Sequence, residues 1–150
     1  MHEPFQIFVK PAGPVCNLAC GYCYYLDKKS LYPAAGSFRM NEQVLENYIL
    51  QHIEASCEST IMFSWHGGEP MLAGIDFFRE AVRLQKKYRP PGAVILNGIQ
   101  TNGTLIDDEW CRLFPSRSEP PCFSGQHSQT VSLPIIGYQV PSRYKAFLES

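Results

Sequence analysis

The segment Cys16-Asn17-Leu18-Ala19-Cys20-Gly21-Tyr22-Cys23 places three cysteines close together, with the spacing C-x3-C-x2-C. A [4Fe–4S] cluster is normally held by four cysteine thiolates. With three thiolates and no fourth cysteine nearby, one iron would lack a protein ligand and stay open to a small molecule. The spacing therefore predicts Cys16, Cys20 and Cys23 as metal ligands, and it indicates that a second ligand binds beside them.

Zinc and disulfides are the alternatives for these cysteines. Structural zinc takes four ligands, usually in two close pairs, but Cys57 and His66 lie far along the chain without paired spacing. A disulfide framework is typical of short secreted chains. The polar opening Met1-His2-Glu3-Pro4 is followed by no long apolar run, which predicts no export signal. We therefore prefer the iron–sulfur cluster, and zinc binding and disulfides stay open as alternatives.

Composition narrows the class of protein. The chain has 150 residues, 45% of them hydrophobic, which predicts one globular domain. Its net charge of −1 predicts no bulk attraction to nucleic acid or to an anionic membrane. No run approaches the roughly 20 apolar residues of a membrane span.

Six cysteines without an export signal predict a reducing, cytoplasmic location. We interpret Cys57, Cys111 and Cys122 as unpaired, the first two as small buried side chains beside helices.

Hydrophobic patterning predicts alternating strands and helices. We expect strands at 5–9, 60–65 and 93–101, with Ala93-Val94-Ile95-Leu96 starting the third. Helices are expected at 42–55, at 76–89 and, briefly, after Asp107, whereas 27–36 is expected to be loop. Such alternation predicts an α/β fold with parallel strands joined by right-handed crossovers.

Three motifs each follow one of these strands: the cysteine segment, Gly67-Gly68-Glu69-Pro70 and Thr101-Asn102-Gly103. Ligands of parallel sheets bind beyond the carboxyl ends of the strands. The order of motifs along the chain therefore predicts that all three lie at one edge and form one site.

The motifs and their flanks resemble a known family. Ile7-Phe8-Val9-Lys10-Pro11 precedes the cysteines and Tyr24-Tyr25 follows them; downstream come 63–74, FSWHGGEPMLAG, and 100–107, QTNGTLID. In this order they resemble the anaerobic sulfatase-maturating enzymes, SPASM-type members of the radical S-adenosylmethionine (SAM) superfamily. The likeness runs from about Phe5 to Phe114.

The resemblance implies a fold, a reaction and partners. Residues 1–114 would form about three βα units, the N-terminal portion of a partial (β/α)6 TIM-like barrel. The cofactors would be a [4Fe–4S] cluster and SAM, whose cleavage gives a 5′-deoxyadenosyl radical that starts oxidation of a sulfatase Cys or Ser to Cα-formylglycine. The target sulfatase and an electron donor such as flavodoxin or ferredoxin would be its partners.

The same resemblance implies that SAM binds the open iron and is surrounded by residues at the ends of the strands. From the residues alone, an aromatic between two cysteines could merely shield the cluster, and Gly-Gly-Glu-Pro could be a turn with a capping Glu. We interpret His66 as a hydrogen-bonded structural residue. The implied SAM-binding residues are Tyr22, Gly67, Gly68, Glu69, Gln100, Thr101 and Asn102.

Residues 115–150 differ in composition from the rest of the chain. They are rich in proline and serine and show no sustained hydrophobic periodicity. Pro115, Pro120 and Pro121 exclude a regular helix there. The run Val131-Ser132-Leu133, interrupted by Pro134 before Ile135-Ile136, could form an edge strand and cover the open edge of the third strand. We interpret 115–150 as an irregular tail that is foreign to the family, from a frameshifted, spliced or broken reading frame. A genuine but divergent tail is the alternative.

The family's catalytic Asp and auxiliary-cluster cysteines lie beyond the part that matches, and the sequence offers no substitutes. We therefore expect a truncated protein that holds a cluster but does not complete turnover alone. Two alternatives stay open: another radical SAM enzyme that modifies peptides, such as a thioether-forming maturase, and a non-catalytic cluster-binding fragment.

Overall fold

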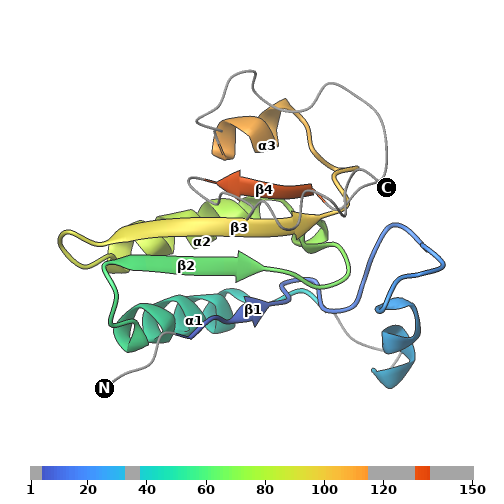
Figure 1. Cartoon of the computed structure of the whole chain (residues 1–150), viewed down its shortest axis with the longest axis horizontal. Helices are drawn as coiled ribbons and strands as arrows, with labels where there is room; N and C mark the ends of the chain where they lie inside the picture. The colour runs from blue at the N-terminus through green and yellow to red at the C-terminus, as the bar shows by residue number, and fades with distance from the viewer. Residues whose placement is uncertain (1–4, 33–37, 115–130, 136–150) are drawn as a thin grey trace, which may run out of the picture.

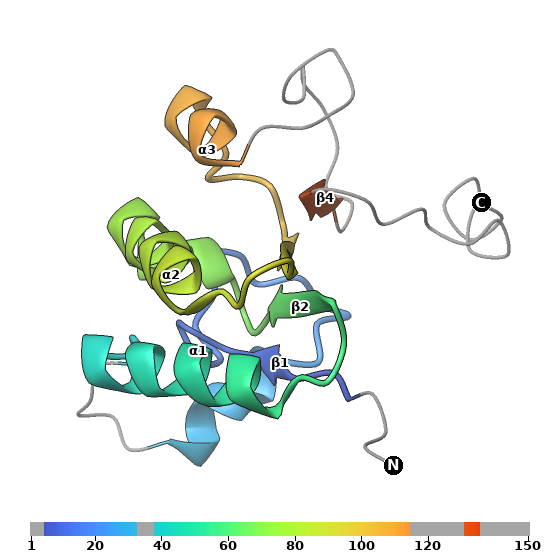
Figure 2. The ribbon, with the colours of Figure 1, turned by 90° about the vertical axis from the view of Figure 1, so that its left-hand side faces the viewer.

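The computed structural model describes residues 5–32, 38–114 and 131–135. They form one four-stranded sheet in the order β1-β2-β3-β4, with two long helices on one of its faces (Figures 1 and 2). The elements, in chain order, are β1 (Phe8–Val9), the 3-10 helix η1 (Leu26–Leu31), α1 (Glu42–Ala55), β2 (Thr60–Trp65), the 3-10 helix η2 (Pro70–Ala73), α2 (Ile75–Tyr88), β3 (Val94–Thr101), α3 (Asp108–Leu113) and β4 (Val131–Ile135).

The predicted α/β architecture is confirmed. β1, β2 and β3 are parallel neighbours, with α1 between the first two in the chain and α2 between the next two. Local signals explain the helix boundaries. The Asn41 side chain accepts a hydrogen bond from the Val44 N–H at 2.9 Å and so starts α1. Asp107 caps α3 by accepting from the backbone N–H groups of its first turn.

Two predicted segments were wrong. The first strand is limited to Phe8–Val9, because Phe5 packs edge-on against His52 instead of extending the strand. The predicted loop over 27–36 begins as η1, and residues 33–37 lie outside the described part of the chain. Bonds from the Cys23, Leu26 and Lys28 N–H groups, each to the carbonyl three residues earlier, carry tight helical turns from the cysteine segment into η1.

The tail contributes the edge strand that the sequence suggested. β4 pairs antiparallel with β3 and covers its free edge, with Pro134 opposite Gly98. Proline lacks a ladder donor and is tolerated at a sheet edge, which is the position that β4 has in the sheet order. The rest of the predicted irregular tail lies outside the described residues.

The hydrophobic core lies between the sheet and the helices. Alternate residues of β2, Ile61, Phe63 and Trp65, point to this side and are buried. Trp65 packs edge-on against Phe77 and Phe78 of α2. Among the described residues no α-helix lies on the opposite face of the sheet (Figure 2). The helices therefore fix the sheet from one side only.

A buried polar cluster joins α2 to both central strands. The Trp65 indole N–H donates to Asn97 Oδ1 at 2.9 Å. The Gln85 and Asn97 side-chain amides donate to one another's oxygens at 2.8 and 2.9 Å. Buried polar groups are costly unless they are paired, and here each amide offers the other both a donor and an acceptor. The cluster therefore fixes α2 against β2 and β3.

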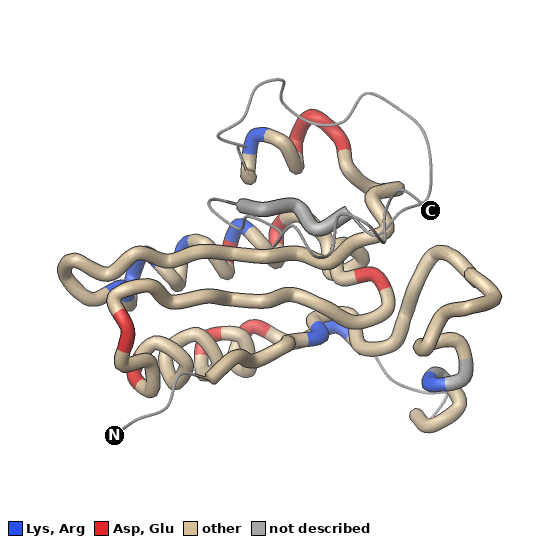
Figure 3. The backbone as a smooth tube through the Cα atoms, in the orientation of Figure 1, with Lys and Arg blue, Asp and Glu red and all other residues tan. Residues whose placement is uncertain are grey.

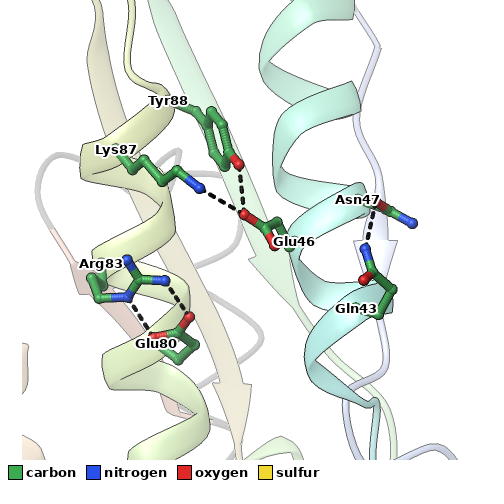
Figure 4. A network of polar contacts seen from close by, with 7 residues as sticks. All are labelled: Gln43, Glu46, Asn47, Glu80, Arg83, Lys87 and Tyr88. Carbon is green, nitrogen blue, oxygen red and sulfur yellow. Dashed lines mark hydrogen bonds and ion pairs between the residues drawn. The ribbon is translucent and has the colours of Figure 1, made fainter.

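Polar contacts also join α1 to α2 at the surface (Figure 4). The Glu46 carboxylate accepts from Tyr88 Oη at 2.5 Å and from Lys87 Nζ at 2.9 Å. These two bonds, the first above all, lower the pKa of Glu46. Exposed pairs of this kind contribute little to stability, so the two helices are held mainly by their apolar sides. In the described part of the chain, no helix is long and apolar enough to cross a membrane.

Candidate functional site

The three predicted motifs meet in one cavity of about 250 Å³ at the carboxyl ends of β1, β2 and β3. This is the edge at which ligands of parallel sheets bind. Its lining includes the three cysteines of the motif and residues from both other strand ends. The lining residues are Cys16, Leu18, Cys20, Tyr22, Cys23, Tyr24, Tyr25, His66, Gly67, Gly68, Gln100, Thr101 and Asn102.

Backbone bonds between two loops place the cysteine segment beside the end of β2. The Gly68 N–H donates to the Gly13 carbonyl at 3.0 Å, and the Glu69 N–H donates to the Val15 carbonyl at 2.8 Å. The segment that leads into Cys16 therefore continues the pairing of β1 with β2 as irregular backbone. This pairing sets where the cysteines begin.

Gly67 and Gly68 make that approach possible. Gly67 has φ +118°, a conformation that side chains rarely adopt. A Cβ at Gly68 would lie 2.3 Å from the Val15 carbonyl oxygen and 2.6 Å from that of Pro14. The missing Cβ atoms thus admit the protein's own cysteine-bearing loop. This is a structural requirement for the glycines in addition to any contact that their carbonyls make with a ligand.

Glu69 is the one predicted site residue that does not line the cavity. It is fully buried, and its carboxylate accepts from the Met71 N–H at 2.9 Å, from Thr101 Oγ1 at 2.8 Å and from the Asn102 N–H at 2.8 Å. Glu69 also caps η2, as one of the two interpretations of this motif proposed. Its side chain joins the ends of β2 and β3 inside the protein.

Two of the three sulfur atoms accept backbone hydrogen bonds. The Leu18 N–H donates to Cys16 Sγ, and the Tyr25 N–H donates to Cys23 Sγ, both at 3.4 Å. Asn102 Nδ2 lies 3.6 Å from Cys16 Sγ. N–H groups aimed at sulfur stabilise negative charge there, which is the environment that a metal-binding thiolate needs.

The donor set fits an iron–sulfur cluster. Three thiols line one cavity, and two of them have N–H donors. Among the described lining residues there is no carboxylate, and His66 contributes a single imidazole. In the described part of the chain, no three His, Cys, Asp or Glu side chains are already gathered as a metal site. The fit therefore rests on the identity and common location of the donors.

The loop that carries the cysteines is uncharged. No charged residue lies between Lys10 and Asp27, and the tube over this stretch in Figure 3 is free of blue and red. Charged groups nevertheless lie close by, because Lys10 Nζ and Lys28 Nζ lie over the rings of Tyr25 and Tyr24, which both line the cavity. Hydrogen bonds to sulfur and these lysine charges are therefore both local influences on a bound cluster.

Tyr22 projects from this loop, with 85% of its surface exposed. It lies beside Cys20, and the negative thiolate form of Cys20, together with their hydrogen bond, raises the pKa of Tyr22. Tyr24, which also lines the cavity, is largely exposed as well. Two aromatic rings thus stand at the mouth of the cavity without being packed in the core.

His66 lines the cavity from the end of β2. Burial lowers the pKa of His66, and the positive charge of the nearby Lys10 lowers it further. A hydrogen bond with Gln100 acts in the opposite direction and raises this pKa. Its ring packs edge-on against Phe8. These contacts agree with the structural interpretation of His66. The residue also lines the cavity, where the minor alternative, a catalytic base at the end of this strand, would place it.

Sequence reasoning missed Asn17 and Thr104. Asn17 Nδ2 donates to Thr104 Oγ1 at 2.8 Å, and the Asn102 side chain contacts both. The sequence Asn102-Gly103-Thr104 was the available signal. In such turns the Asn side chain commonly accepts a hydrogen bond from the backbone N–H two residues further along the chain. The Thr104 N–H does donate to Asn102 Oδ1, at 3.0 Å.

The interpretation of the remaining cysteines needs correction. Cys57 is exposed rather than buried, because it lies beyond the end of α1. Cys111 is disulfide-bonded, although its sequence neighbours gave no sign of a pair. Disulfides depend on proximity in the fold, which spacing alone does not reveal. Cys122 lies outside the described residues.

The family model of the radical SAM superfamily matches residues 11–116 of the chain. This span contains the cysteine motif and both strand-end motifs that line the cavity. The chain belongs to the radical SAM superfamily. The resemblance inferred from the cysteine spacing and its flanks is therefore confirmed.

Relatives of this radical SAM chain include sulfatase-maturating enzymes of two types. It is 46% identical over 112 residues to the serine-type anaerobic sulfatase-maturating enzyme of Bacteroides thetaiotaomicron, covering 75% of this chain and 27% of the relative. It is 49% identical over 113 residues to the serine-type enzyme of Klebsiella pneumoniae, covering 74% and 27%. It is 36% identical over 109 residues to the cysteine-type enzyme of Clostridium perfringens strain 13, covering 73% and 29%.

A solved structure shares the fold. Native anSMEcpe with bound AdoMet and Cp18Cys peptide superposes with a TM-score of 0.62 at 35% identity, over 75% of this radical SAM chain and 28% of that chain. The chain thus spans little more than a quarter of the length of the relatives it matches. The predicted fold, the N-terminal portion of a radical SAM barrel, is confirmed by this partial match.

Proposed function

We propose that the chain holds a [4Fe–4S] cluster through Cys16, Cys20 and Cys23 and binds SAM beside it, as the N-terminal part of a sulfatase-maturating type of radical SAM core. The observation that carries this proposal is the single cavity lined by all three cysteines and by the ends of β2 and β3. When bound, the pair of cofactors supplies one-electron reductive cleavage of the SAM sulfonium.

The chain's own residues would bind and orient SAM. Gly67 and Gly68 expose backbone at the cavity wall, where carbonyl oxygens suit the methionyl amine. Tyr22 would contact the adenine, since it lines the cavity and most of its surface is exposed. Gln100, Thr101 and Asn102 supply the wall from β3. Glu69 would act from inside, holding the two strand ends together without touching SAM.

The proposed substrate is a sulfatase peptide whose Cys or Ser is oxidised to Cα-formylglycine. Support comes from the relatives, whose names state sulfatase maturation, and from anSMEcpe, whose structure contains a peptide. Identity is higher to the serine-type relatives than to the cysteine-type relative, which favours a Ser target. Electrons would come from a flavodoxin or ferredoxin, and the proposed location is cytoplasmic.

Anaerobic reconstitution tests the cofactor part of the proposal. The chain is incubated with iron, sulfide and reductant, and we expect about four irons and four sulfides per chain with the visible absorbance of a cluster. Cys16→Ala, Cys20→Ala and Cys23→Ala should each lose most of the iron, whereas Cys57→Ala should load normally. A colourless, iron-free parent chain would contradict the proposal.

A peptide assay tests the substrate part separately. The loaded chain is given SAM, reductant and sulfatase-derived peptides that carry either Ser or Cys, and the products are followed by mass spectrometry. We expect no formylglycine from this chain alone, in line with the sequence-based expectation that turnover needs further residues. Formylglycine formation would refute that expectation while leaving the cofactor proposal intact.

A further inference from the structure

Asn102 connects the buried end of β3 to the first cysteine of the motif. Its side-chain Nδ2 lies 3.6 Å from Cys16 Sγ and 2.9 Å from Asn17 Oδ1. Asn102 directly follows β3, and it is 86 residues away from Cys16 in sequence. The contact therefore depends on the fold and not on the local turn.

The orientation of the Asn102 amide follows from its partners. The Thr104 backbone N–H can only donate, and it lies 3.0 Å from Asn102 Oδ1. The atom that it contacts must therefore be the oxygen, which turns the NH2 group toward Cys16. Thr104 Oγ1 adds a second contact to Oδ1, at 2.7 Å. The donor that faces the sulfur is thus specified by the network.

The network closes on itself. Asn17 Nδ2 donates to Thr104 Oγ1, the Thr104 hydroxyl donates to Asn102 Oδ1, and Asn102 Nδ2 donates back to Asn17 Oδ1. Each group in the ring has one donor facing one acceptor. Because Asn17 directly follows Cys16, the ring fixes the start of the cysteine motif against the end of β3.

Glu69 anchors this ring from the core. Its buried carboxylate accepts the Asn102 backbone N–H at 2.8 Å and holds Thr101 Oγ1 at 2.8 Å. The backbone of Asn102 is therefore tied to a group that solvent does not reach. The side chain above it is presented to Cys16 from a fixed base.

We propose that Asn102 is a positioning residue whose amide donates a hydrogen bond to the Cys16 sulfur and raises the reduction potential of the cluster held there. This inference rests on the proposed function. Reduction adds negative charge to the cluster and its sulfur ligands, and an N–H donor stabilises that charge. The Leu18 N–H also donates to this sulfur, at 3.4 Å, so in the described part of the chain Asn102 is one of two N–H donors that face it.

The test is a redox titration of the reconstituted 150-residue chain, followed by the paramagnetic signal of the reduced cluster. Asn102→Leu removes the donor without adding charge, and we expect its midpoint to shift to more negative potential. Asn102→Asp directs a negatively charged oxygen at the sulfur, and we expect it to shift the midpoint potential further in the negative direction. Thr104→Val loosens the ring but keeps the amide, so a smaller shift in the same direction is expected.

Asn47→Leu is the matched control, because Asn47 is exposed on α1, pairs with Gln43 (Figure 4) and is not among the residues that line the cavity. Equal midpoints for Asn102→Leu and Asn47→Leu would overturn the inference. If Asn102→Leu fails to take up iron, the loaded Thr104→Val chain decides, and an unshifted midpoint there overturns it. A parent chain that takes up no cluster would instead refute the proposed function.

Discussion

Gly68 shows at the scale of one residue how the backbone shapes the site. Gly68→Ala would place a Cβ within 2.3 Å of the Val15 carbonyl oxygen, against backbone that cannot easily move. We expect a loss of about 1–3 kcal/mol in the free energy of unfolding. Urea denaturation measures it.

Gly98→Ala in β3 is the control, since among the described residues, its two chain neighbours aside, no atom lies within 4 Å of its added Cβ. It should change stability by no more than about 0.5 kcal/mol. Equal effects of the two substitutions would show that the close approach of the two loops is not as described.

His52 gives the fold a dependence on pH. The Met62 carbonyl can only accept, so His52 Nε2 carries the proton at 3.0 Å, and in the described part of the chain Nδ1 is buried without a partner. Burial lowers the pKa of His52 below 6.5. The unfolded chain therefore takes up a proton first, and stability is full above pH 6.5 and falls as the pH drops through the folded-state pKa.

His52→Gln should reduce this loss of stability, because Gln keeps a donor for the Met62 carbonyl and does not titrate. Urea midpoints measured between about pH 7 and pH 5 test it. Part of the slope should remain, since burial lowers the pKa of His66 too. An unchanged slope in His52→Gln would contradict this assignment.

At the scale of elements, the Gln85–Asn97 pair ties α2 to the sheet. Gln85→Leu would leave the buried Asn97 amide without its Gln85 partner. An unsatisfied buried donor costs about 1–3 kcal/mol, and we expect a loss of that size in chemical denaturation.

Gln43→Leu on the exposed side of α1 removes a comparable amide in solvent and should cost no more than about 0.5 kcal/mol. Equal losses of unfolding free energy in Gln85→Leu and Gln43→Leu would mean that the buried pair stabilises the fold no more than an exposed pair does.

The elements that sequence predicted well carry strong local signals. α1 has an Asn41 cap and apolar residues at helical spacing, and β2 is a short run of bulky apolar residues between turns. β1 and η1 were mispredicted because their limits depend on tertiary contacts, such as Phe5 against His52. β4 was foreseen only as a suggestion, since Pro134 is compatible with a strand only at an edge.

For the whole molecule, the order of motifs along a parallel sheet was enough to predict that cysteines, glycines and Thr101-Asn102 meet at one edge. Sequence could not show which side chains face the cavity. Glu69 was expected there but is buried, whereas Asn17 and Thr104 were overlooked because their roles arise from one ring of hydrogen bonds across 87 residues. Such networks depend on side-chain directions that only the fold specifies.

The central claim is that three thiolates hold a cluster with one iron open to SAM. The most direct measurement is the paramagnetic spectrum of the reduced, reconstituted chain recorded with and without SAM. We predict a cluster signal that changes when SAM is added. We also predict that the Cys20→Ala variant lacks the cluster signal. A parent chain that loads iron and sulfide but gives a spectrum indifferent to SAM would contradict the claim.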